Sequence, residues 1–336
     1  MAEPLLEVVD LTVSFPTEDG LVKAVDHVSL TVDSGETLGV VGESGSGKSV
    51  SFLTVMGLTN RKSAIVEGKV LFQGVDLLEL SPDEFQEFRG KKIGMVFQDP
   101  MTSLHPFYKV GDQIAETILA HRGVSKKEAA DRAVDMLQRV GIPKPAERAK
   151  QYPHEFSGGM RQRAMIAMAL SLNPDLLIAD EPTTALDVTV QAQILELISR
   201  LKEEFNAAVV IITHDLGVVA EYCDHIQVMY AGKIVEKGSA EDIYHASEHP
   251  YTWGLLRSIP RLDAEVDRLQ PIKGLPPSLI FVPSGCAFHP RCPYAFERCL
   301  DEVPELLPTD GMHYTACHLS MSDRERIFHE DVEVRR

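Results

Sequence analysis

The sequence is short of positive charge. Its 336 residues include 33 Lys and Arg against 50 Asp and Glu, which gives a formal net charge of −17. An acidic excess of this size argues against an extended face for DNA or RNA, so we expect no nucleic-acid partner. A nucleotide pocket is still compatible with this charge, because it needs only a few local hydrogen-bond donors.

Long apolar runs and cysteines are also scarce. No run reaches the roughly 20 apolar residues that a membrane-spanning helix needs, and the N-terminus lacks the basic and apolar regions of a secretory signal. We therefore expect a cytosolic protein, unless a partner holds it at a membrane. In a reducing cytosol its five cysteines are expected to be thiols or metal ligands rather than disulfides.

Short runs of Val, Ile and Leu are present, and they predict strands buried on both faces of a parallel sheet. These strands are expected at 37–42, 175–180, 208–213 and 225–231. Helical patterns separate them, at 111–121, 126–140, 159–172, 188–205 and 215–222. Strands that alternate with helices predict an α/β layered fold.

Other segments depart from this alternation. In the first 35 residues, apolar and polar residues alternate on both sides of the turn "PTEDG". This pattern predicts antiparallel strands at one edge. Residues 100–170 are mostly helical and predict an inserted subdomain, and "AGKIVEKG" predicts a hairpin with Gly232 in its turn. Beyond this hairpin the chain becomes rich in Pro and Cys. We predict one domain at 1–245 and a C-terminal extension at 246–336.

The stretch "GESGSGKSV" has the spacing of a phosphate-binding loop, Gly42-x4-Gly47-Lys48-Ser49, between a predicted strand and a predicted helix. Its glycines let backbone N–H groups point at phosphate oxygens, and the helix start adds positive charge. Lys48 would reach the β- and γ-phosphates, and the Ser49 hydroxyl would bind Mg²⁺. The residues expected to contact the nucleotide are Gly42, Glu43, Ser44, Gly45, Ser46, Gly47, Lys48, Ser49 and Val50.

Two further segments carry polar groups suited to this chemistry. Asp180 and Glu181 end the apolar strand "LLIADEP", where an Asp of a phosphate-loop enzyme helps to hold Mg²⁺ and a Glu can act as general base. An ordinary acidic turn is the alternative. Ser157 is a good N-cap for the helix that follows, and Gly158 and Gly159 allow close backbone approach to an anion at its start.

Together these motifs resemble those of the nucleotide-binding subunit of an ABC transporter, over nearly the whole chain. The resemblance identifies a Walker A loop at 42–49, a Q-loop in "FQDP" with Gln98, and a Walker B strand that ends at Asp180. The signature is "FSGGMRQR", with Phe156 and Met160 where Leu and Gln are commoner. A D-loop "TALD" with Asp187 and a switch histidine, His214 in "IITHD", complete the set.

The resemblance implies a P-loop ATPase mechanism. Two subunits would pack head to tail, each ATP lying between the Walker A loop of one and the helix of Ser157, Gly158 and Gly159 of the other. Gln98 would contact Mg²⁺ and the attacking water and would sense the membrane domains. Glu181 would polarise that water as the general base. His214 would stabilise the γ-phosphate. Phe15 would stack on adenine, with an ordinary edge-strand aromatic as the alternative.

The stretches "GESGSGKSV", "FQDPMTSLHP" and "HPYTWGLL" are similar to those of the ATPases of bacterial dipeptide and oligopeptide importers. This implies a heterodimer with a second homologous ATPase, beneath two permeases at the cytoplasmic face of the membrane. An external binding protein would deliver the peptide. Nickel or an opine is the alternative cargo. A non-transport ABC protein would need a long coiled-coil insertion or a second cassette, and the chain has neither.

Four of the cysteines lie near the end of the chain, with the spacing Cys286-x5-Cys292-x6-Cys299-x17-Cys317. Structural zinc sites usually use pairs of cysteines that lie closer together in the chain. The wide spacing found here suits a loop wrapped around a larger metal group. Peptide-importer ATPases carry a similar segment, so the resemblance favours a [4Fe–4S] cluster as a folding staple. Zn²⁺, or free or buried thiols, are the alternatives. Cys223 is expected to be a buried apolar residue.

Overall fold

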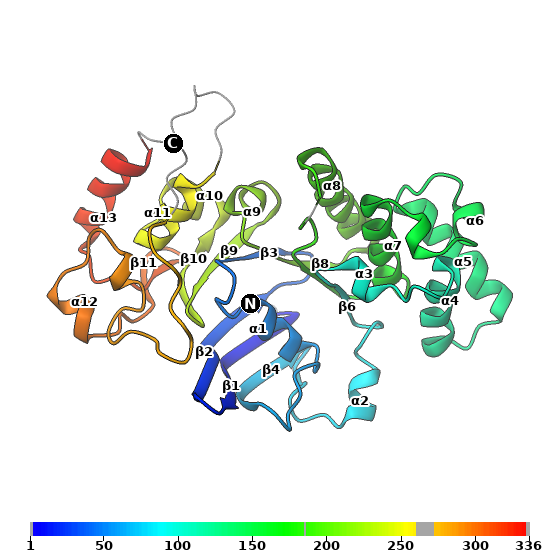
Figure 1. The fold of residues 1–336 in the computed structure, drawn as a ribbon, viewed down its shortest axis with the longest axis horizontal. Helices are drawn as coiled ribbons and strands as arrows, with labels where there is room; N and C mark the ends of the chain where they lie inside the picture. The colour runs from blue at the N-terminus through cyan, green and yellow to red at the C-terminus, as the bar shows by residue number, and fades with distance from the viewer. Residues whose placement is uncertain (1–2, 185, 260–271, 334–336) are drawn as a thin grey trace. The chain divides into compact units, whose positions relative to one another are not determined.

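The computed structural model describes residues 3–184, 186–259 and 272–333 (Figure 1). Contacts divide the chain into two compact units. Unit 1 consists of Met1–Val32, Thr37–Leu78 and Ile212–Arg336, and unit 2 of Asp33–Glu36 and Glu79–Ile211. Each unit is described by itself below. The predicted limits of an ATPase domain at 1–245 and an extension at 246–336 stay a prediction.

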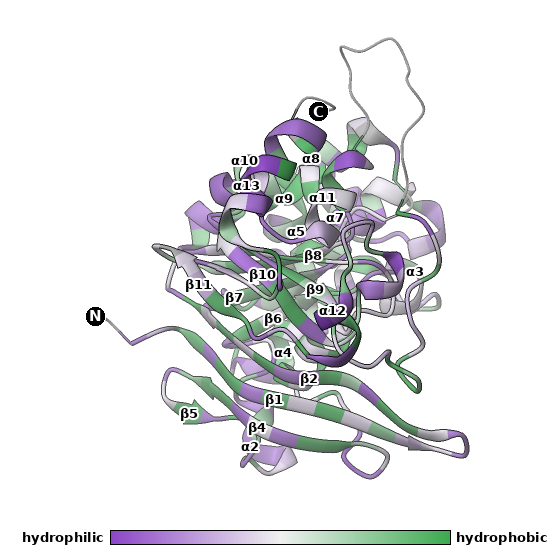
Figure 2. Ribbon diagram, turned by 90° about the vertical axis from the view of Figure 1, so that its left-hand side faces the viewer, coloured by the Kyte–Doolittle hydropathy of each residue, from purple (hydrophilic) through white to green (hydrophobic). Residues whose placement is uncertain are grey.

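The N-terminal part of unit 1 is an antiparallel sheet with the strand order β2-β1-β4-β5. Its strands are β1 (Leu6–Thr17), β2 (Gly20–Val32), β4 (Ile65–Phe72) and β5 (Val75–Asp76). The β1–β2 hairpin closes at Thr17 opposite Gly20, which confirms the predicted antiparallel edge. Figure 2 shows hydrophobic and hydrophilic residues mixed along these strands, as expected when one face packs on a core.

The second sheet segment of unit 1 has the order β11-β12-β10-β9-β3. It contains β3 (Thr37–Val41), β9 (His225–Tyr230), β10 (Lys233–Ser239), β11 (Leu307–Asp310) and β12 (His313–Thr315). Strands β3 and β9 are parallel, as predicted. Strands β9 and β10 form the predicted hairpin, where Gly232 has a φ of 84° that favours glycine.

The C-terminal part of unit 1 is more regular than its sequence indicates. It holds the helices α10 (Ala240–His245), α11 (Pro250–Arg257), α12 (Glu297–Asp301) and α13 (Met321–Ile327), which α9 (Leu216–Tyr222) precedes. Strand β12 pairs with β10, Thr315 lying opposite Glu236. The last part of the chain therefore extends the sheet that begins with β3.

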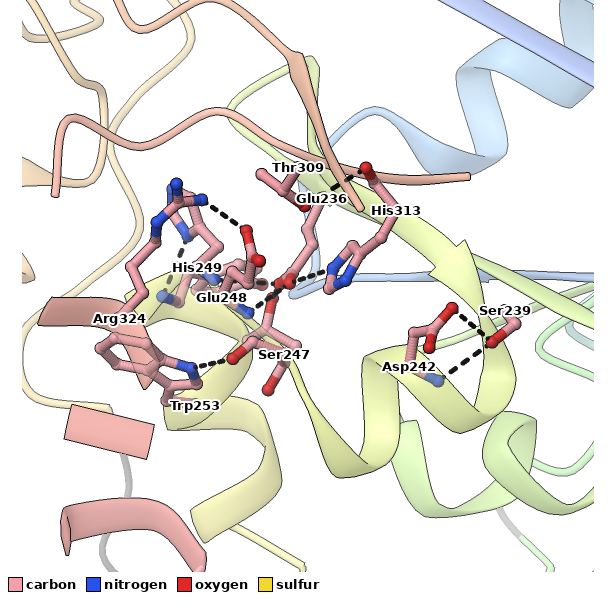
Figure 3. A network of polar contacts seen from close by, with 12 residues as sticks. Glu236, Ser239, Asp242, Ser247, Glu248, His249, Trp253, Thr309, His313 and Arg324 are labelled. Atoms are coloured by element: carbon pink, nitrogen blue, oxygen red, sulfur yellow. Dashed lines mark hydrogen bonds and ion pairs between the residues drawn. The ribbon is translucent and has the colours of Figure 1, made fainter. Parts of the chain in front are cut away.

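A buried polar network fixes this part to β10 (Figure 3). Glu236 of β10 has no exposed surface. Its carboxylate accepts hydrogen bonds from the backbone N–H of His249 at 3.2 Å, from the Thr252 hydroxyl and from His313 Nε2 at 2.9 Å. Because a buried polar group is costly without hydrogen-bond partners, this network ties β12 and α11 to one position on β10.

Unit 2 has a parallel core with the order β8-β7-β6. Its strands are β6 (Ile93–Val96), β7 (Leu176–Asp180) and β8 (Ala208–Thr213), and β6 and β7 are parallel. Every residue of β7 and β8 is buried. This confirms the predicted strands at 175–180 and 208–213. Strand β6 was not predicted, because four apolar residues alone do not separate a strand from a helix.

Helices make up most of the remainder of unit 2. They are α2 (Pro82–Gln86), α3 (Pro100–Ser103), α4 (Val110–His121), α5 (Lys126–Arg139), α6 (Pro145–Arg148), α7 (Gly158–Leu170) and α8 (Val188–Phe205). The apolar spacing of α5 places Ala129, Ala133, Met136 and Leu137 on its buried face. The predicted helices at 111–121, 126–140, 159–172 and 188–205 are confirmed.

Candidate functional site

The glycine loop of unit 1 connects β3 to α1 (Lys48–Val55). Gly47, the N-cap of α1, has a φ of 101°, and a Cβ there would lie 2.3 Å from the Ala24 carbonyl oxygen. A Cβ at Gly42 would lie 2.2 Å from the Met229 carbonyl oxygen. Both positions therefore require glycine, because the loop runs against the backbone of β2 and β9.

The loop has polar groups that suit an anion. Lys48 is only 4% exposed, and its Nζ donates to the carbonyl oxygens of Gly42 at 2.7 Å and Glu43 at 3.0 Å. The buried Ser46 Oγ has no hydrogen-bond partner among the described residues. Ser44 and Gly45 form the exposed rim of the loop, and Ser49 and Val50 are half-buried in the first turn of α1. A phosphate group could satisfy the donors of this loop.

In unit 2, the carboxylates lie at the end of β7. Asp180 is 6% exposed, and Glu181 follows it with a φ of 45°, in the left-handed region that non-glycine residues seldom adopt. Glu181 Oε2 accepts hydrogen bonds from Gln98 Nε2 and from the Thr184 hydroxyl, each at 2.8 Å. The predicted pair Gln98 and Glu181 is thus brought together, 83 residues apart in the chain.

Thr184 was missed from the sequence. Its only signal is its position three residues after Glu181, within a turn that brings its side chain back to the carboxylate. Gln98 follows β6, so the parallel pairing of β6 with β7 places both loops at the same edge of the sheet. The contact between Gln98 and Glu181 therefore depends on the order of the strands, which local sequence does not reveal.

The helix that starts with Ser-Gly-Gly is α7. Ser157 is its N-cap, and its hydroxyl accepts a hydrogen bond from the Met160 N–H at 3.3 Å. A Cβ at Gly159 would lie 3.0 Å from Val190 Cγ1, whereas a Cβ at Gly158 would meet Leu186 at an ordinary 3.6 Å. Gly159 thus lets α7 begin close to the segment that contains Asp187.

The remaining predicted residues lie on separate elements. Asp187 is the N-cap of α8 and accepts a hydrogen bond from the Val190 N–H at 3.0 Å. In unit 1, His214 is exposed and follows β8. Phe15 lies half-buried in β1, opposite Val22, so its stacking on adenine stays a prediction.

The four C-terminal cysteines line one narrow cavity, together with His249, Phe288 and His318 among others. Burial raises the pKa of Cys292 and of Cys317 to about 12, so these thiols keep their protons at neutral pH. Among the described residues, no three Asp, Glu, His or Cys side chains are placed to hold one metal ion. Cys223 is 8% exposed, which confirms it as a buried residue.

Comparison with known families gives two matches. Residues 25–184 match the model of the family described as ABC transporter. Residues 235–299 match the model described as oligopeptide/dipeptide transporter, C-terminal region. The first match contains the glycine loop and the end of β7, and the second contains the first two cysteines of the cluster and ends at the third.

Among curated relatives, the chain is 54% identical to an oligopeptide transport ATP-binding protein OppD from Salmonella typhimurium, over 90% of each chain. It is 51% identical to a dipeptide transport ATP-binding protein DppD from Lactococcus lactis, over 93% of this chain and 90% of the relative. It is also 51% identical to an OppD from Bacillus subtilis, over 96% and 91%.

Solved structures show the same fold. A dimeric ATP-binding cassette, bound to ADP and Pi in a post-hydrolysis state, matches 70% of this chain and 98% of its own at a TM-score of 0.63 and 30% identity. A cassette from Clostridium perfringens matches 73% and 92% at a TM-score of 0.62 and 26% identity. Within residues 3–184, 186–259 and 272–333, no helix is long and apolar enough to cross a bilayer.

Proposed function

The chain belongs to the ABC transporter ATPases of the oligopeptide and dipeptide import family, and on that premise we propose how its residues bind and hydrolyse ATP. The protein hydrolyses ATP to energise peptide import through a membrane transporter. The assignments below concern its individual residues, its cysteines and its partners.

The glycine loop at 42–49 is the proposed phosphate site. The observation that carries this assignment is the buried ammonium of Lys48, which donates to the carbonyls of Gly42 and Glu43. Carbonyl oxygens only partly offset a buried charge, so a phosphate is the better partner. The Ser46 hydroxyl, which has no hydrogen-bond partner within the described part of the chain, supports the same assignment. Ser49 and Asp180 are the proposed protein ligands of Mg²⁺, which neutralises phosphate charge when bound.

Replacing Lys48 by Ala tests this assignment. The variant should lose ATP binding by about 100-fold or more, because it removes the cation that faces the phosphates. Fluorescent ATP-analogue titration of the purified full-length subunit would measure the loss. Lys92→Ala is the matched control, since Lys92 pairs with Asp175 at the surface of unit 2. ATP affinity that survives Lys48→Ala would contradict the proposed phosphate site.

Glu181 is the proposed general base. Gln98 and Thr184 both donate to its Oε2, which orients a carboxylate that can accept a proton from an attacking water. Gln98 would contact the attacking water and Mg²⁺, and His214 would stabilise the γ-phosphate.

The proposed active form is a head-to-tail pair with a second, homologous ATPase. The start of α7, with Ser157, Gly158 and Gly159, would face the ATP of the partner, and Asp187 would lie beside it. Two observations support this. Similar cassettes are dimeric in their solved structures, and the Met160 N–H bonded to Ser157 marks an ordered helix start with further N–H groups for an anion.

Two permeases and an extracytoplasmic peptide-binding protein are the further proposed partners, with the ATPase held at the cytoplasmic face of the membrane. Large apolar side chains are exposed just beyond Gln98 and support a docking surface there. Phe107 is 81% exposed, Tyr108 57% and Met101 51%. Dipeptides or oligopeptides are the proposed cargo, which the permeases and the binding protein select.

A [4Fe–4S] cluster held by Cys286, Cys292, Cys299 and Cys317 is the proposed cofactor of the C-terminal part. What supports it is that all four cysteines line one narrow cavity; within the described residues their thiols are not placed to hold a metal ion, so they would have to move together on cluster binding. The cavity is only about as large as a water molecule, so its walls would have to move outward. Zn²⁺ is the alternative. Iron, sulfide and zinc analysis after anaerobic purification separates these outcomes, and stoichiometric zinc without iron would exclude the cluster.

A further inference from the structure

We propose that Arg291, within the cysteine segment, positions the phosphate loop through Glu43, so that the C-terminal segment is a working part of the ATP site. The cysteine segment is defined here as residues 284–299. The proposal rests on the assignment of residues 42–49 as the phosphate loop. It adds a positioning residue that lies about 250 residues beyond that loop in the chain.

The contact between the two segments is a bidentate ion pair. Arg291 Nη1 donates to Glu43 Oε2 at 2.6 Å, and Nη2 donates to Oε1 at 2.9 Å. The side chain of Arg291 is 5% exposed and that of Glu43 is 27% exposed. Two parallel, charge-assisted bonds fix direction as well as distance, and burial shields them from solvent. This pair therefore differs from a surface ion pair of little consequence.

Other contacts hold the guanidinium of Arg291 in place. Its Nε donates to the Lys273 carbonyl oxygen at 3.1 Å, and Nη1 also donates to the Tyr230 hydroxyl at 3.4 Å. Its Cζ lies 5.9 Å from the ring centres of both Tyr230 and Phe288. The guanidinium of Arg291 is thus contacted from several sides without a nucleotide, as expected of a positioning residue.

The cysteine segment sets the position of Arg291 through its backbone. Arg291 lies in the single turn His289–Arg291, between Cys286 and Cys292. The His289 N–H donates to the Cys286 carbonyl at 2.9 Å, and the Cys286 N–H donates to the Cys299 carbonyl at 2.9 Å. A change in the arrangement of the cysteines would therefore shift the turn that carries Arg291.

Glu43 is held at three points. Its N–H donates to the Tyr251 hydroxyl at 2.8 Å, its carbonyl accepts from Lys48 at 3.0 Å, and its carboxylate pairs with Arg291. Tyr251 belongs to α11 and has no exposed surface. Burial also raises the pKa of Tyr251 and keeps its hydroxyl neutral. The first turn of the loop, and hence the direction of its N–H groups, depends on residues beyond 245.

A double-mutant cycle in the purified full-length subunit tests whether the Arg291–Glu43 ion pair positions the phosphate loop. Arg291→Met and Glu43→Gln should each weaken binding of a fluorescent ATP analogue by about tenfold, because the loop loses its fixed entry. The double variant should be no weaker than either single variant. Arg291→Lys should restore affinity only in part, since an ammonium cannot form the two parallel bonds.

The matched control is Arg298→Met in the same segment, because Arg298 pairs with Glu302 at the surface. It should leave ATP affinity unchanged. Thermal unfolding of each variant separates positioning from stability. Unchanged ATP affinity in folded Arg291→Met, whatever its melting temperature, would overturn the proposal. Strictly additive effects in the double variant would overturn it as well.

The route through the cysteines needs its own measurement. Cys292→Ser, next to Arg291, should weaken ATP binding in the wild-type chain and have no further effect in the Glu43→Gln/Arg291→Met chain. Equal effects in both backgrounds would mean that the segment acts by another route. A wrong assignment of the phosphate site would show in a separate experiment. In that case the Lys48→Ala variant would keep its ATP affinity.

Discussion

At the scale of single residues, the same chemical group has different roles according to its surroundings. Glu181 follows the end of β7 and accepts hydrogen bonds from Gln98 and Thr184, a setting for proton transfer in the proposed mechanism. Glu236 is wholly buried and bonded on both oxygens, a setting for structure. Glu43 has its charge committed to Arg291. Burial and hydrogen-bond partners, rather than residue type, distinguish a glutamate that acts as a base from one that holds the structure in place.

Glu181→Gln should leave ATP affinity unchanged and lower the rate of hydrolysis by about 100- to 10,000-fold, the usual contribution of a general base. Gln has the same shape but cannot take a proton from water. Phosphate release by the assembled transporter measures the rate. Glu196→Gln, an exposed change on α8, is the control. Near-normal turnover by the Glu181 variant would refute its assignment as the base.

His313 should make stability depend on pH. Burial alone would lower the pKa of His313, but its hydrogen bond to Glu236 and the nearby carboxylates of Glu248 and Asp242 raise the pKa above its usual 6.5. The charged form is therefore favoured in the folded state. Its contribution is fully present below pH 6.5 and is lost as the pH rises through the raised pKa.

His313→Gln keeps a hydrogen-bond donor but removes this charge. The variant should lose about 1 kcal/mol more free energy of unfolding at pH 6 than at pH 9, as measured by urea unfolding. His245→Gln, an exposed change on α10, should lose little at either pH. The buried His249 has a pKa lowered to about 4 by desolvation, so its effect on the pH dependence of stability has the opposite sign. This effect is present in both the wild-type and the variant chain and cancels when they are compared. A pH-independent loss would contradict the prediction.

At the scale of elements, the phosphate loop depends on the strands around it. Gly42 and Gly47 lie against the carbonyls of Met229 and Ala24, which belong to β9 and β2. The local motif predicts the loop, but these neighbours decide which glycines admit no other residue. The parallel pairing of β6 and β7 similarly brings Gln98 to Glu181.

Two glycines of the same loop should respond differently to alanine. Gly47→Ala adds a Cβ 2.3 Å from the Ala24 carbonyl oxygen at a φ of 101°, so the start of α1 must move and ATP binding should fall by about 100-fold. Gly45→Ala has a φ of 80° but open space around its Cβ, and should cost about 1 kcal/mol of stability. Equal losses of ATP affinity would contradict the steric argument.

At the scale of the whole molecule, the site is incomplete by itself in the proposed mechanism. In that mechanism the helix start at Ser157 would face the ATP of a partner subunit. The chain should therefore be a weak ATPase alone, and its rate should rise by about tenfold or more with its partner subunits. Phosphate release with and without these subunits measures the gain. A full rate from dilute, monomeric subunit would rule out the composite site.

The sequence by itself determined the chemistry and most of the fold. Its motifs predicted the glycine loop, the carboxylates after β7 and the buried parallel strands, because these depend on residue type and local spacing. Tertiary structure decided what lies far apart in the chain. It placed Thr184 beside Glu181, built strands and helices beyond residue 245, and joined Arg291 to Glu43. No local pattern carries such pairs, since they arise only when strand order and burial bring distant segments together.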